Sequence, residues 1–152
     1  MTLAVSSILS QAASHAKRLG LFKQVMTHEP KSAPRNGLTA CLWVNSIAPV
    51  PGVSGLAATS GRVELSVRIY ESMLSEPQDA IDVRILGATE KLMAAYSGDF
   101  TLGGEVMEVD LLGAHGTALS AEAGYLNQDG KLYRVMVITL PLIISDIWNQ
   151  IA

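Results

Sequence analysis

Residues Gly61-Arg-Val-Glu-Leu-Ser-Val-Arg-Ile-Tyr70 decide how we expect this chain to fold. Aliphatic side chains occupy every second position of the stretch: Val63, Leu65, Val67 and Ile69. Between them lie the polar residues Arg62, Glu64, Ser66 and Arg68. Because side chains alternate across a β-strand, this order places an apolar row on one face and the charges on the other. The pattern predicts a strand whose charged face meets water or another subunit.

Two segments supply the apolar stripes that would cover such a sheet on its other face. Residues 3–19 predict a helix with Ile8 at the margin of a stripe formed by Val5, Leu9, Ala12, Ala16 and Leu19. Thr2 is a candidate cap for its start and Gly20 a candidate stop. Residues 79–97 predict a second helix, whose core-facing stripe is Ile81, Ile85, Ala88, Leu92, Ala95 and Tyr96. Ser75 and Gln78 resemble a capping box before it.

The remaining segments of regular structure are predicted to be strands. Residues 38–50 predict a long strand that pairs with residues 61–70 as a hairpin, and the uncharged loop 51–60 joins the two strands. Residues 21–26 form only a short apolar segment. Further strands are expected at 105–112, 119–126 and 131–144, the last of them central in the sheet and ending near Pro141. Asn127-Gln-Asp-Gly130 predicts a tight turn. We therefore expect one domain over residues 1–152, of the α+β class, with a mainly antiparallel sheet packed by two amphipathic helices.

Composition limits the classes of function. Hydrophobic residues make up 49% of the chain and charged residues 16%, against about 25% charged residues in average domains. Such a shortage of charge indicates a surface partly covered by partners. The net charge of −3 and the lack of a Lys/Arg cluster argue against sequence-specific nucleic-acid binding. No apolar run reaches the ~18–20 residues of a membrane span, and no secretion signal is recognisable, so we expect folding in a reducing cytoplasm.

Residue types that carry chemistry are scattered along the chain. Its three histidines are not spaced from other ligands as in a zinc site, which favours surface or capping roles: His15, His28 and His115. Cys41 lies in an apolar run and is predicted to be a buried, unreactive thiol. We therefore predict no catalytic residue, no metal site and no cofactor. The alternative is a site assembled in space, with a concave pocket that gathers His28, Glu29 or His115 with an acid.

Seven short segments, spread over nearly the whole chain, resemble those of a known family. They are Leu21-Phe22, Thr27-His-Glu-Pro-Lys31, Gly55-Leu-Ala-Ala-Thr-Ser60, Glu76-Pro-Gln-Asp-Ala-Ile-Asp82, Tyr96-Ser-Gly-Asp-Phe100, Val109-Asp-Leu-Leu-Gly113 and Pro141-Leu-Ile-Ile144. The family comprises tail components of long-tailed, non-contractile (siphovirus-type) phages of actinobacteria. Within that family the chain most resembles the tail terminator proteins.

This resemblance implies a structural protein of the virion, assembled in the host cytoplasm, rather than an enzyme. Terminators are small α+β subunits of a hexameric ring at the head-proximal end of the tail tube, where the ring stops tube polymerisation and then accepts the head's connector. The implied partners are further copies of the chain, the tail-tube protein on one face and a head-completion or connector protein on the other. The implied ring has no cofactor and no membrane contact, and its lumen is open to DNA. A head-completion protein, a tube subunit, and a small ligand-binding or enzymatic domain remain the alternatives.

The predicted interface combines the charged face of the 61–70 strand with the loop 51–60. Arg62, Glu64 and Arg68 lie on that face. Val53 and Leu56 would be exposed without benefit if the loop stayed in water, so we expect them to anchor it on a neighbouring subunit or on the last ring of the tube. As a surface residue, Arg62 should tolerate replacement by alanine at a cost within about 0.5 kcal/mol in an isolated subunit.

Overall fold

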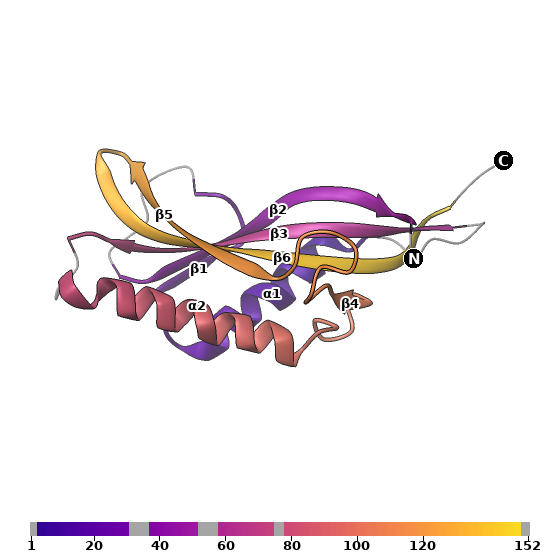
Figure 1. Ribbon diagram of the computed structural model, residues 1–152, viewed down its shortest axis with the longest axis horizontal. Helices are drawn as coiled ribbons and strands as arrows, with labels where there is room; N and C mark the ends of the chain where they lie inside the picture. The colour runs from indigo at the N-terminus through magenta and orange to yellow at the C-terminus, as the bar shows by residue number, and fades with distance from the viewer. Residues whose placement is uncertain (1–2, 31–36, 52–57, 75–77, 150–152) are drawn as a thin grey trace.

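The computed structural model of this protein describes residues 3–30, 37–51, 58–74 and 78–149, and it is elongated, with a long sheet above two helices (Figure 1). The helices are α1 (Val5–Leu19) and α2 (Ile81–Gly98), the latter preceded by a 3-10 turn at Gln78–Ala80. The strands are β1 (Gln24–Met26), β2 (Thr39–Val50), β3 (Ala58–Ser72), β4 (Glu108–Val109), β5 (Ser120–Gln128) and β6 (Lys131–Asn149).

Strand pairing gives one six-stranded sheet in the order β1-β2-β3-β6-β4, with β5 also paired to β6. β5 and β4 share one side of β6: β5 pairs with residues 131–139, and β4 with Leu142 and Ile143. β1 lies parallel to β2, and the other described pairs are antiparallel. The predicted α+β class with a mainly antiparallel sheet is therefore confirmed, as is the central position of the last strand.

The main core lies between the sheet and both helices, which cover the same face (Figure 1). The alternating aliphatic residues of β3 are at most 1% exposed, as predicted: Val63, Leu65, Val67 and Ile69. α2 buries the predicted stripe except for the half-buried Ala95. On α1 the buried face is centred on Ile8, Ala12 and Ala16, so Ile8 is not marginal. The alanines let α2 approach closely, and the Tyr96 hydroxyl donates a hydrogen bond to the carbonyl of Ala12 at 3.0 Å.

A smaller apolar cluster lies on the sheet face away from the helices. Its buried members are Cys41, Tyr70, Tyr133 and Val135. The two tyrosine rings meet edge to face, with centroids 6.2 Å apart. Burial raises the pKa of the Cys41 thiol to about 12, so the reactive thiolate does not form at neutral pH. The prediction that Cys41 is buried is thus confirmed, and its raised pKa favours the less reactive thiol form.

β6 continues through Pro141 to Asn149, so the prediction that Pro141 ends the strand is wrong. Pro141 lies between Thr139, the last residue paired with β5, and Leu142, which is paired with β4. Its carbonyl accepts a hydrogen bond from the backbone N–H of Asp110 at 2.9 Å. In an antiparallel ladder the N–H and C=O of one residue face the same neighbouring strand. The position where Pro141 has no N–H therefore faces the side of β4 and β5, at the gap between these two strands. The pairing of β6 with β3 therefore loses no hydrogen bond.

Two other local predictions are corrected by tertiary contacts. Residues 105–112 form turns with only the two-residue strand β4, and residues 21–26 contain the unpredicted strand β1. α2 begins after Ala80, which makes no side-chain cap, and Gln78 belongs to the preceding 3-10 turn. Thr2 and Ser75, the other proposed capping residues, lie outside the described residues. Gly20 ends α1 in the left-handed conformation, as predicted.

A bulge in β6 changes its register with β3 near the end of the sheet. Thr59 pairs with Trp148 but Gly61 pairs with Ile144, so three residues of β6 lie opposite one residue of β3. Ile147, one of those three residues, lies in the core and is 8% exposed. A Cβ atom on Gly61 would collide with the Cδ1 atom of Ile147, so a larger residue here has to displace that side chain.

Replacing Gly61 with alanine is expected to destabilise the protein by about 1–3 kcal/mol, because Ile147 has to move out of a packed position. Gly87 in α2 is the matched control, since a Cβ there meets nothing within 4 Å, and alanine should gain about 0.5–1 kcal/mol in a helix. Urea unfolding of both variants tests the difference. Equal free energies of unfolding for the two variants would contradict the packing described at Gly61.

Candidate assembly surfaces

Arg62 is buried, against the prediction that it lies on an open face. It is 8% exposed because the segment 110–117 folds over the sheet face away from the helices. Its Nη1 donates to Asp110 Oδ2 at 2.7 Å, and its Nη2 donates to Glu64 Oε1 at 3.1 Å and to the carbonyl of Thr117. We call Arg62, Glu64, Asp110 and Thr117 the Arg62 cluster. It ties the 110–117 segment to the middle of the sheet.

Asp110 is the anion on which the cluster depends, and its side chain is 3% exposed. Burial alone raises the pKa of this carboxyl group. Hydrogen bonds from the backbone N–H groups of His115 and Ala114, at 2.9 and 2.8 Å, and the contact with Arg62 outweigh that effect. The pKa of Asp110 is consequently below its usual range, and the ionised carboxylate holds the turn at 110–115.

The stability of the protein is expected to fall in acid partly through Asp110. A carboxyl group whose pKa is lowered by folding adds stability above its unfolded-state pKa of about 3.9, and that stability is lost as the pH falls through the folded-state pKa. Asp110→Asn removes this dependence and leaves Arg62 without its buried anion. At pH 7 the variant should be less stable than the wild-type protein. Between about pH 5 and pH 2 its free energy of unfolding should fall by less than that of the wild-type protein. Urea unfolding across that range is the measurement, and equally steep losses in both proteins would contradict the assignment.

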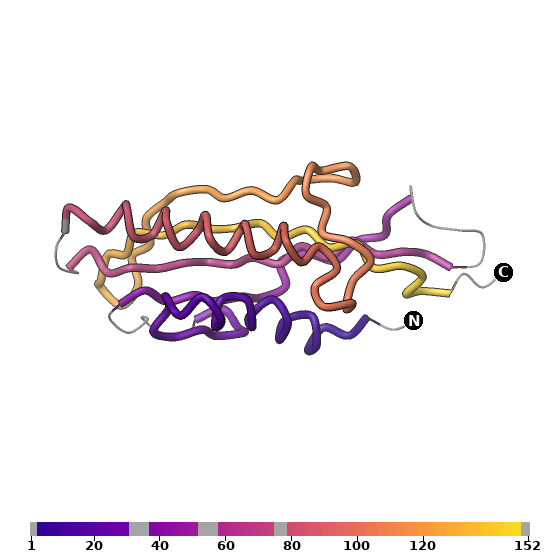
Figure 2. The backbone as a smooth tube through the Cα atoms, turned by 90° about the horizontal axis from the view of Figure 1, so that it is seen from below, coloured from indigo at the N-terminus to yellow at the C-terminus, as the bar shows by residue number. Residues whose placement is uncertain are grey.

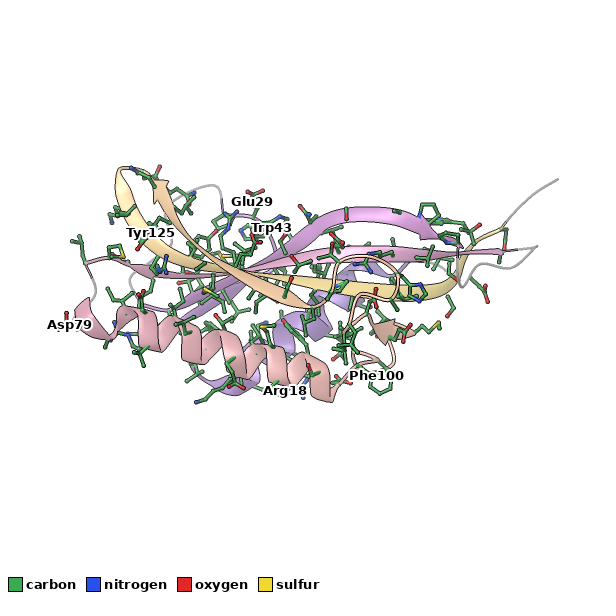
Figure 3. The ribbon with its side chains drawn as sticks, viewed as in Figure 1. Arg18, Glu29, Trp43, Asp79, Phe100 and Tyr125 are labelled. Atoms are coloured by element: carbon green, nitrogen blue, oxygen red, sulfur yellow. The ribbon has the colours of Figure 1, made fainter. Side chains whose placement is uncertain are left out.

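The other predicted interface residues also make contacts within the subunit. Glu64 accepts from Arg62, and its side chain is 20% exposed. The Arg68 guanidinium lies over the rings of Trp43 and Tyr70, at 4.9 and 5.6 Å from their centroids, and donates to the Tyr70 hydroxyl at 3.1 Å. Trp43 lies on the opposite side of the sheet from Arg18 and Phe100 (Figure 3). Val53 and Leu56 lie outside the described residues.

The histidines do not gather at a site. His15, predicted to be a surface or capping residue, is 8% exposed and contacts Asp99 Oδ2 at 2.8 Å, which joins α1 to the end of α2. The backbone N–H of Gly103 is the main cause of the lowered pKa of Asp99, with a further contribution from His15. His28 is exposed, and His115 lies 3.8 Å from Glu108. Within the described residues, no three potential ligands lie together as a metal site would require.

The sheet has open edges on two opposite sides. β1 covers β2 only at Thr39–Cys41, so from Leu42 to Pro49 the strand has β3 as its one strand neighbour in the described part of the chain. On the other side, the described pairing of β5 is with β6 alone. The β2 edge, residues 42–49, contains no charged residue, and β5 contains only Glu122. Natural edge strands usually carry charges that prevent pairing with other chains.

α2 also leaves apolar side chains uncovered, with Val83 72% and Leu86 52% exposed. A cavity of about 620 Å³ lies on its β1 side and is lined there by Leu21, Lys23, Gly37 and Leu38. A groove of about 570 Å³ lies on its β5 side and is lined by residues that include Met93, Leu111, Leu112, Leu119 and Ala121. We call these the β1-side cavity and the β5-side groove. The residues that line the two do not include His28, Glu29 or His115, the groups named for an assembled site.

Comparison with known proteins adds no family assignment. Neither a protein-family model nor a curated protein matches the chain. Among the described helices, none is long and apolar enough to cross a membrane.

Proposed function

We propose that this chain is a structural protein of a phage tail whose copies form a ring that ends tail-tube polymerisation and provides the surface for joining the head. The proposal starts from the resemblance to tail terminators, which also supplies the hexameric ring, the tail-tube protein and the head connector as partners, and the virion as location. The observation that carries it beyond the resemblance is the pair of open, charge-poor edges on opposite sides of one sheet.

Two different edges favour assembly by a repeated head-to-tail contact. When the β2 edge of one copy meets the β5 edge of the next, each copy still offers one free edge, so the chain of contacts either closes into a ring or continues as a filament. Backbone pairing of this kind needs no particular side chain, and the scarcity of charge removes one of the usual barriers to it. A monomer with these edges would be prone to aggregation. A closed ring covers them all.

The exposed apolar residues also support contacts above and below such a ring. Leu74, Tyr125 and Leu132 are exposed near the turn between β5 and β6, and Trp148 is exposed near the other end of β6. Single exposed hydrophobic residues are common, but exposed apolar side chains near both ends of the long strand β6 suit a ring that is placed between two partners. The tail tube and the head connector are the partners that we propose.

Electron microscopy of the purified protein tests this function against the nearest alternative. A terminator is expected to give single rings that do not stack, because the ring stops growth. A tail-tube subunit has the same need for lateral contacts, but its rings stack into long tubes. Tubes of indefinite length at high protein concentration would overturn the terminator proposal and favour the tube subunit.

A further inference from the structure

Leu112 is the most exposed of the large hydrophobic residues in the described part of the chain, at 93%. It lies in the turn that the Arg62 cluster holds in place. The carboxylate of Asp110 accepts hydrogen bonds from Ala114 and His115, and the Gly113 N–H donates to the carbonyl of Asp110 at 3.3 Å. Because the backbone on both sides of Leu112 is already fixed, docking of this side chain would cost little ordering entropy.

The β1-side cavity has the chemistry to receive such a side chain. Its walls include four aliphatic residues, namely Leu21, Leu38, Val83 and Ala88. Its charged lining residues carry a net positive charge, since Lys23, Lys91 and Arg84 outnumber Glu71. Arg84 Nε donates to Glu71 Oε1 at 2.8 Å, whereas both lysines are exposed and no salt bridge is found for them among the described residues. The cavity therefore favours an apolar group that is accompanied by acidic residues.

The surroundings of Leu112 supply those acidic residues. Glu90 lines the β5-side groove together with Leu112, and its neighbour Lys91 lines the β1-side cavity, so the two flanks of α2 carry opposite charges. Glu108 lies 3.8 Å from His115 of the same turn, and its side chain is 38% exposed. Figure 2 shows the segment after β4 on one side of α2, and α1 with the chain that follows it on the other.

We infer that Leu112 of one copy inserts into the β1-side cavity of the next copy, with Glu90 and Glu108 near Lys91 and Lys23 of that neighbour. This inference rests on the proposed ring and names the side-chain contact that would close it. The contact is heterologous, because the inserted side chain and the cavity lie on opposite flanks of α2, so it can repeat from copy to copy. The charge pairs lie at its rim, so association should weaken as salt rises.

Two variants remove opposite halves of this contact. Leu112→Asp removes the apolar group at a fully exposed position, and Gly87→Phe fills the cavity from its wall, where an added Cβ meets nothing within 4 Å. Each variant alone should associate at least about 30-fold more weakly than the wild-type protein. Gly98→Phe is the matched control, since Gly98 is also exposed on α2 with open space around it but lies outside both lining sets.

Mixing the two variants gives the decisive result, because only one type of interface stays intact. Leu112 of the Gly87→Phe variant meets the unfilled cavity of the Leu112→Asp variant, and each remaining pairing lacks at least one half. Light scattering should therefore detect monomers for each variant alone, one-to-one dimers for the mixture, and wild-type assembly for Gly98→Phe. If both single variants still form rings, this contact is wrong while the ring proposal stands. If the wild-type protein and the mixture both stay monomeric at every concentration, the proposed contact is wrong. The ring proposal is then tested separately, by the number of copies in assembled tails.

Discussion

Replacing Arg62 with alanine is expected to destabilise the protein by about 3–5 kcal/mol, because it leaves the buried carboxylate of Asp110 without its cation. This loss is far larger than the limit of about 0.5 kcal/mol expected for Arg62 as a surface residue on the polar face of β3. The 110–117 segment would also lose the donor to the carbonyl of Thr117. Urea unfolding at one fixed protein concentration measures the change, since assembly also contributes to apparent stability.

Two comparisons make this prediction specific to the buried pair. Lys17→Ala removes a cation from the exposed side of α1 and should change the free energy of unfolding by no more than about 0.5 kcal/mol. The double replacement of Arg62 by methionine and Asp110 by leucine should recover part of the loss, because neither charge is then left buried alone. The recovery is incomplete because the N–H groups of Ala114 and His115 lose their acceptor. A loss for Arg62→Ala as small as that for Lys17→Ala would show that residues 110–117 do not cover the arginine.

Leu65→Ala is expected to cost about 2–5 kcal/mol, because Leu65 is fully buried at the centre of β3 and its truncation leaves a cavity beneath the helices. Leu112→Ala is the matched control, with the same chemical change at a position that is 93% exposed. In a dilute, monomeric sample it should cost no more than about 0.5 kcal/mol. Similar losses at the two positions would contradict the assignment of the faces of β3.

The elements that the sequence predicts well are those with a complete local pattern. The alternation in 61–70 and the stripe of 81–96 place each side chain relative to its neighbours along the chain, so the buried face follows from the period alone. The turn at Asp129-Gly130 is equally local, and it joins β5 to β6 as expected. Those features were enough for the fold class.

The errors concern residues whose surroundings are set by distant parts of the chain. Arg62 is buried by a carboxylate 48 residues away, and Pro141 is tolerated inside β6 because two different strands meet opposite it. β1 is a three-residue strand that depends on the edge of β2. Periodicity carries no information about such partners.

The candidate site was the least predictable part of the molecule. The sequence predicted an interface on the charged face of β3 and on the loop with Val53 and Leu56. It gave no indication of the open edges at β2 and β5. One signal was available: residues 110–113 combine an acid, two leucines and a glycine in a segment that also carried the family resemblance. Leu111 packs against the main core, whereas Leu112 is exposed beside it.

The number of copies of this chain in each assembled tail tests the central claim most directly. Quantitative mass spectrometry of purified tails, with the tube protein as internal standard, gives that number, and antibody labelling gives its position. We predict six copies per tail, all at the end that joins the head. Many copies distributed along the whole tail, or one copy per tail, would contradict the proposal that this chain forms the ring that ends the tube.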